Sequence, residues 1–227
     1  MLVKNIARGI AALSISLFVT SCTKDNYSAP SSVLYGSFLD KDTHELVEQD
    51  IIQGTQIELV EKGYSAIQFL VVKNDGTFRN SMLFTNEYKV IPVRGNFEPI
   101  DTQTVNIKGE TELNFNVKPY IRIKNLNISI DGATVTATFN LQQTGSQNVQ
   151  KIGLFVSPES AVGSTFFVQK AEVPVGGRID ESQTLTVKMD LSSSSLKKGK
   201  LYYFRAGAIV DVAQAKYNYA KTVQLPY

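Results

Sequence analysis

From Val33 onward the chain alternates short apolar runs with turn residues, and this pattern favours β-sheet over every other architecture. No long window has the 3.6-residue period of an amphipathic helix. Residues 134–139 alternate polar and apolar side chains, which is typical of a half-buried antiparallel strand. Asn74-Asp75-Gly76 and Asp131-Gly132 predict tight turns, because Asp and Gly tolerate positive φ. We therefore predict an all-β fold.

The predicted strands form two sets that meet at Lys118-Pro119, where proline suits a strand end or a domain joint. The first set covers residues 33–39, 56–60, 68–72, 87–93, 104–107 and 112–117. The second set covers residues 120–123, 127–130, 134–141, 150–157, 166–173, 185–190, 201–210 and 217–225. Many short strands at regular spacing predict two tandem β-sandwich domains, residues 33–118 and 119–227.

The N-terminus has the architecture of a secretory signal peptide. Lys4 and Arg8 precede an apolar run, residues 10–19, which is too short to cross a bilayer as a mature helix. Polar residues 23–32 predict a short flexible tether before the first strand. Removal of residues 1–21 leaves 206 residues with 21 basic and 21 acidic side chains. This balance lacks the basic excess that nucleic-acid binding requires, so we expect no nucleic-acid partner.

Val19-Thr20-Ser21-Cys22, an aliphatic residue and two small residues before a cysteine, resembles a bacterial lipobox. The resemblance implies that residues 1–21 are removed and that Cys22, the only cysteine, carries an acyl anchor in the outer membrane. A single cysteine also excludes an intramolecular disulfide. Residues 23–26 resemble the tag that sends Bacteroidetes-type lipoproteins to the cell surface. We therefore expect a surface-exposed protein, with the periplasmic face as the alternative.

Two further resemblances concern the domains. Residues 36–40 with Thr43, and residues 57–60, 74–78 and 88–90, carry motifs through which residues 33–118 resemble a carboxypeptidase-regulatory or transthyretin-like β-sandwich. Residues 196–206 make residues 119–227 resemble a fibronectin type III or immunoglobulin sandwich. That second resemblance implies that Tyr202 is a corner tyrosine, whose hydroxyl bonds backbone upstream.

Taken whole, the chain resembles an uncharacterised Bacteroidetes lipoprotein family. Members of this family are often encoded beside a SusC-like TonB-dependent transporter and a SusD-like lipoprotein that import glycans. The resemblance implies a glycan and SusC/SusD-like proteins as partners.

Residues for catalysis are scarce. His44 is the only histidine and lies in a polar turn, where we expect it to be solvated. Zinc sites need several His or Cys ligands. Asp40, Asp42 and Glu45 could offer oxygens to calcium, but they lack the spacing of an EF-hand loop, so a solvated acidic turn is favoured. We expect no catalytic residue, no metal and no cofactor, and hence no enzyme.

Sugar rings stack on exposed aromatic faces, and the chain has ten tyrosines but no tryptophan. Tyr64 lies in a predicted turn, while Tyr217 and Tyr219 share one face of a predicted strand. These three are the candidate ligand-binding residues, although packing inside the sandwich is the commoner role for Tyr217 and Tyr219. For Phe166-Phe167, core packing is favoured over exposure.

These observations predict a non-catalytic cell-surface lipoprotein, an accessory glycan-binding or assembly component of an outer-membrane polysaccharide uptake system. The alternative is a structural or adhesin-type, fimbrial-like protein that engages protein partners. That alternative predicts an open sheet edge or a continuous apolar patch.

Overall fold

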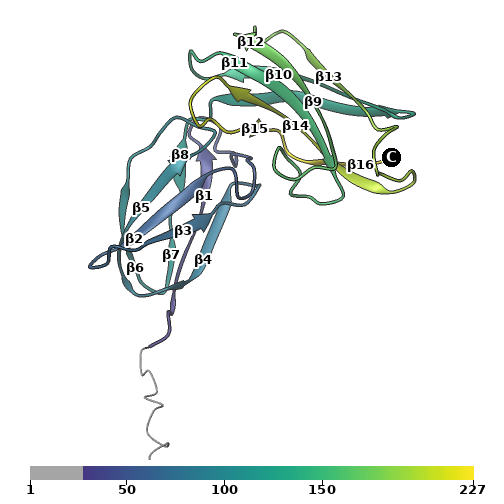
Figure 1. Cartoon of the computed structure of the whole chain (residues 1–227). Coiled ribbons are helices and arrows are strands. Elements are labelled where there is room, and N and C mark those ends of the chain that lie inside the picture. The colour runs from purple at the N-terminus through teal and green to yellow at the C-terminus, as the bar shows by residue number, and fades with distance from the viewer. Residues whose placement is uncertain (1–27) are drawn as a thin grey trace, which may run out of the picture.

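The computed structural model describes residues 28–227, which form two β-sandwiches, the second lying across one end of the first (Figure 1). These residues contain sixteen strands and no helix, so the prediction of an all-β, two-domain fold is confirmed. No helix in the described part of the chain has the length and apolar character needed to cross a membrane. Cys22 and the predicted signal peptide lie outside the described residues.

The first sandwich comprises eight strands. They are β1 (Ser32–Asp40), β2 (Gln56–Glu61), β3 (Ile67–Val71), β4 (Thr77–Leu83), β5 (Asn86–Arg94), β6 (Gln103–Ile107), β7 (Glu110–Glu112) and β8 (Phe115–Val117). One sheet has the order β4-β1-β7, with β8 also paired to β1. The other sheet has the order β3-β2-β5-β6.

The second sandwich comprises the remaining strands. They are β9 (Ile121–Asp131), β10 (Thr134–Gln143), β11 (Val149–Ser157), β12 (Gln169–Gly177), β13 (Leu185–Asp190), β14 (Leu201–Val210), β15 (Asn218–Tyr219) and β16 (Val223–Pro226). Its smaller sheet has the order β13-β10-β9, and its larger sheet has the order β12-β11-β14-β15, with β16 also on β14.

Each sandwich has its own apolar core. Side chains of β1 alternate between buried and half-buried, which places Phe38 inside the first sandwich. Its ring centroid lies 5.1 Å from that of Phe97 and 4.9 Å from that of Phe115, and Phe78 lies 5.9 Å away. Burial of this aromatic cluster is a main source of stability for the first domain.

In the second sandwich the predicted tyrosine corner is confirmed. The Tyr202 hydroxyl accepts a hydrogen bond from the Lys197 amide at 2.8 Å and donates to the Lys197 carbonyl at 3.3 Å. The ring is buried in the second core. The hydroxyl therefore fixes the turn that precedes β14.

The prediction of one strand over residues 112–117 is wrong, because β7 and β8 are separate strands that both pair with β1 in parallel. Between them Leu113 donates from its amide to the Tyr35 carbonyl. A Cβ on Gly36 would lie only 1.7 Å from the Leu113 carbonyl oxygen. The chain can cross β1 so closely only because residue 36 is glycine.

Other features also differ from the prediction: residues 217–225 form two short strands, β15 and β16, and no strand was predicted where β4 lies. Residues 121–131 form one long strand, β9, in which Asn125 at φ 53° absorbs a bulge. The turn at residues 74–76 joins β3 to β4, which lie in opposite sheets. Strand β12 begins at Gln169, which leaves residues 158–168 as a loop. This loop reaches the first domain and lies at the candidate functional site.

Candidate functional site

The two sandwiches meet through a buried polar network centred on Arg205 of β14. Its Nη1 donates to the Gln49 carbonyl at 3.0 Å and to the Val162 carbonyl at 3.2 Å. Its Nη2 donates to the Asn74 carbonyl at 2.9 Å and to the Glu48 carboxylate. Since the guanidinium is fully buried, one side chain ties loops of both domains together.

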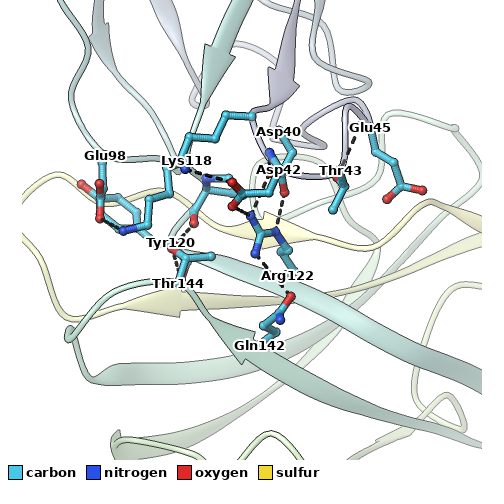
Figure 2. Close-up of polar contacts among 12 residues, drawn as sticks. Asp40, Asp42, Thr43, Glu45, Glu98, Lys118, Tyr120, Arg122, Gln142 and Thr144 are labelled. Carbon is cyan, nitrogen blue, oxygen red and sulfur yellow. Dashed lines mark hydrogen bonds and ion pairs between the residues drawn. The ribbon is translucent and has the colours of Figure 1, made fainter.

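A second polar cluster lies where β1 ends and β9 begins, shown in Figure 2. The Arg122 guanidinium is paired with the carboxylates of Asp40 and Asp42, and Nη1 also donates to Gln142. Burial raises the pKa of Asp40, but the hydrogen bonds and positive charge of Arg122, together with backbone hydrogen bonds from Asp42 and Thr43, outweigh burial and lower the pKa. Both aspartates are therefore ionised partners of an arginine across the junction.

The same ion pairs involve two of the three carboxylates in the acidic turn that could offer oxygens to calcium. Asp40 and Asp42 already have a cation, while Glu45 and His44 are exposed. His44 has φ 59°, and its amide donates to the Asp40 carbonyl, so its role in the turn is conformational. Among residues 28–227, no three His, Cys, Asp or Glu side chains gather as metal ligands would.

Tyr217 and Tyr219 do lie side by side, with ring centroids 5.4 Å apart, but they are only 4% and 7% exposed. Phe155 packs edge-on against both rings. Burial raises the pKa of each hydroxyl, and each donates to a carboxylate, Tyr217 to Glu172 and Tyr219 to Asp50. The proposal that these tyrosines form an exposed sugar platform is therefore wrong, and sandwich packing is their role.

Glu172 on β12 makes the folding of this region sensitive to acid. Burial raises its pKa, but hydrogen bonds from Lys151, Lys170 and Tyr217 outweigh that effect and lower the pKa to about 2. Because the folded value lies below the usual 4.5, ionised Glu172 stabilises the fold above pH 4.5, and this contribution is lost as the pH falls toward 2.

We therefore expect Glu172→Gln to destabilise the protein at pH 7 by more than it does at pH 3, as measured by urea unfolding. Glu110→Gln, in an exposed pair with Arg79, is the control and should show little difference between the two pH values. An equal effect of Glu172→Gln at both pH values would contradict the assignment.

Tyr64 is the one predicted binding residue that the structure leaves accessible. It is 66% exposed in the turn between β2 and β3, beside a shallow hollow of about 270 Å³. The hollow is also lined by Lys62, Glu87 and Lys89, but its second aromatic residue, Tyr88, is buried in the core. One exposed ring provides only a small stacking surface.

A larger apolar depression, of about 470 Å³, lies where the loop of residues 158–168 meets the first domain. Ile51 and Ile52 form its first-domain wall, and Phe166, Phe167 and Val168 form much of its second-domain wall. Phe166 is 42% exposed and Phe167 is 40% exposed. Phe167 packs against Phe155 and carries the Lys170 ammonium 5.1 Å from its ring centroid. Phe166 is thus the ring freer to contact a ligand.

The backbone at Ile52 is strained, with φ 66°, a value that β-branched residues rarely adopt. Arg94 holds this conformation through hydrogen bonds to the carbonyls of Ile52 and Gly54. Such strain persists only where surrounding contacts enforce it, and it is concentrated at functional sites. Sequence reasoning missed Ile51 and Ile52, although two apolar residues between turn residues were a signal that no strand accounted for.

The fold and the polar contacts between the domains define a two-domain β-sandwich protein with an aromatic depression between the domains. Two family models match: the DUF3823 N-terminal domain, of unknown function, at residues 32–118, and the domain of unknown function DUF3823_C at residues 121–224. The chain therefore belongs to the DUF3823 family. No curated protein matches it.

Solved structures of relatives agree with this assignment. A candidate carbohydrate-binding protein from Bacteroides uniformis is 31% identical, with a TM-score of 0.80, covering 88% of this chain and 100% of its own. A DUF3823 protein from Parabacteroides merdae is 24% identical, with a TM-score of 0.74 and coverages of 87% and 100%. A second one from Bacteroides uniformis is 19% identical, with a TM-score of 0.75 and coverages of 87% and 99%. The expected Bacteroidetes family of unknown function is thus confirmed.

Proposed function

We propose that this protein binds carbohydrate without chemical conversion, and that the depression beside Phe166 holds the sugar. The observation that carries the proposal is an aromatic ring exposed in a concave, mostly apolar site. Pyranose rings present C–H faces that pack on such rings. The relative from Bacteroides uniformis, a candidate carbohydrate-binding protein, supports the same class of ligand.

The size and charge of the depression indicate the kind of sugar. A volume of about 470 Å³ lies within the range of small-ligand sites and suits one or two sugar units. Glu159 is the only ionisable residue among its lining residues. A lone carboxylate repels uronic acids and sulfated sugars and can accept hydrogen bonds from hydroxyls. A neutral glycan is therefore the ligand that this site fits.

The proposal also includes the place in the cell where the protein acts. An acyl group on Cys22 would anchor the protein in the outer membrane, on the cell surface, with the periplasmic face as the alternative. There it would serve a SusC/SusD-like uptake system as an accessory glycan-binding component. This setting is supported by the lipobox-like sequence, and mass spectrometry of the N-terminal peptide of the membrane form tests it directly.

Native electrophoresis in gels containing polysaccharide tests the binding. The chain beginning after Cys22 would be run in gels with laminarin, xylan or galactomannan, which are neutral, and alginate, which is anionic. We expect retardation by at least one neutral gel. Phe166→Ala is expected to weaken that affinity by roughly three- to tenfold, the contribution of one aromatic contact.

Phe69→Ala is the matched control, because Phe69 is 57% exposed on β3, a strand of the first domain that does not line the depression. Its mobility should equal that of the unsubstituted protein, and so should that of Tyr64→Ala. Retardation by alginate alone, or equal losses for Phe166→Ala and Phe69→Ala, would contradict this assignment of the site.

A second function, protein assembly, is favoured by one observation. Strand β3 lies at a sheet edge and has no charged residue, and its Ile67, Phe69 and Val71 side chains are exposed. Proteins usually protect such edges with charge or proline. Light scattering on the same sample separates the two functions: a monomer that binds a neutral glycan supports the first, whereas an oligomer without glycan binding supports assembly.

A further inference from the structure

The carboxylate of Asp50 accepts hydrogen bonds across the domain junction and, among residues 28–227, forms no ion pair. Asp50 belongs to the first domain and is 3% exposed. Its Oδ2 accepts hydrogen bonds from the Ser164 hydroxyl at 2.7 Å and from the Tyr219 hydroxyl at 2.9 Å, both in the second domain. Its Oδ1 faces the Thr165 amide at 3.4 Å. A buried carboxylate is costly unless its oxygens are bonded, so these contacts hold the two loops in one arrangement.

The second domain is shaped to admit this carboxylate. A Cβ on Gly163 would lie 2.2 Å from Asp50 Oδ1 and 3.1 Å from the Tyr219 hydroxyl. Since φ at Gly163 is not in the left-handed region, space rather than conformation requires glycine at this position. The Tyr219 hydroxyl also accepts from the Ser164 amide at 2.8 Å, so it is oriented to donate to Asp50.

The position of Asp50 in the sequence connects this contact to the depression. Asp50 directly precedes Ile51 and Ile52, the first-domain wall, and its partners Ser164 and Thr165 directly precede Phe166, in the opposite wall. Thus the residue that joins the two loops is adjacent to both walls. Arg205 bonds the carbonyl of Gln49, which directly precedes Asp50, and the carbonyl of Val162, which directly follows the lining residue Ala161.

We propose that Asp50 is a positioning residue that assembles the sugar site from the two domains, by setting Phe166 against Ile52. The inference rests on the proposed function for its role in binding, but its structural part can be tested without a ligand. Asp50 itself does not line the depression. It acts through the loop of residues 158–168 rather than by contact with sugar.

Hydrogen exchange measured by mass spectrometry tests the structural part. The protein would be the chain beginning after Cys22, because residues 28–227 contain both cores in full. In Asp50→Asn and in Gly163→Ala, which blocks the carboxylate from the opposite side, amides in the segment 158–168 should exchange about tenfold faster. Ser164→Ala, which removes one donor, should give a smaller increase. Asp101→Ala, an exposed carboxylate of the same domain, is the control.

The neutral-polysaccharide gels test the functional part. Asp50→Asn and Gly163→Ala should each weaken affinity for the polysaccharide as Phe166→Ala does. In a protein that already carries Phe166→Ala, the further change Asp50→Asn should cause no additional loss of affinity. A general loss of stability would instead add to the effect of Phe166→Ala. Unchanged exchange in both variants, or faster exchange with unchanged retardation, overturns the inference. If the unsubstituted protein is not retarded by any gel, the proposed function fails, and the exchange data alone decide whether Asp50 positions the loop.

Discussion

Replacement of Arg205 by alanine is expected to lower the free energy of unfolding by about 3–5 kcal/mol, the usual cost of leaving a buried charge without its partner. Arg205 is fully buried, and its loss would strand the Glu48 carboxylate. It would also remove the hydrogen bonds that the Gln49 and Val162 carbonyls accept. Urea unfolding monitored by circular dichroism measures the effect.

Arg79→Ala is the matched control, because Arg79 forms an exposed pair with Glu110 and should contribute less than about 1 kcal/mol. A double variant, Arg205→Met with Glu48→Gln, should recover part of the loss, since it removes the stranded charge. If Arg205→Ala were no more destabilising than Arg79→Ala, the junction would not be held as described.

Phe38→Ala should cost about 3–5 kcal/mol, and it should act on the first domain. The fully buried ring contacts three other phenylalanines, so truncation opens a cavity that a sheet cannot easily close. Calorimetry should show the first domain unfolding at lower temperature, while the second core, which shares no residue with the cluster, melts later.

Phe69→Ala again provides the control, because the same side chain lost from an exposed position should change stability by no more than about 0.5 kcal/mol. Phe38→Leu should fall between the two, since it retains much of the buried volume. If the variant instead showed a single melting transition at a lower temperature, the two domains would unfold together, and the prediction of separate unfolding would be wrong.

The sequence predicted those features that depend on local pattern. The predicted ranges 185–190 and 201–210 coincide with β13 and β14, because alternation and flanking turns define a strand locally. The role of Tyr202 was implied by the resemblance of residues 196–206, a continuous stretch, to a fibronectin type III or immunoglobulin sandwich. Here the residues that determine the structure are neighbours in sequence.

The candidate site depends on contacts between distant residues, and these were not predicted. Alternation shows that Tyr217 and Tyr219 share a face, but their burial depends on Phe155 and on Asp50, which is 169 positions away from Tyr219. In the same way, Phe166 was expected in a strand and in the core. It lies instead in a loop that is hydrogen-bonded to Asp50 of the first domain, a contact that no local pattern records.

Strand β1 determines how far the candidate site lies from the start of the first domain. Its nine residues span about 30 Å, from Ser32 at the far end of the first sandwich to Asp40, which is paired with Arg122 at the junction (Figure 1). Arg205 also joins the domains, and the first sandwich separates Ser32 from their junction. With the proposed anchor at Cys22, it would hold a captured glycan a full domain's length from the tether, where long chains in solution can reach it.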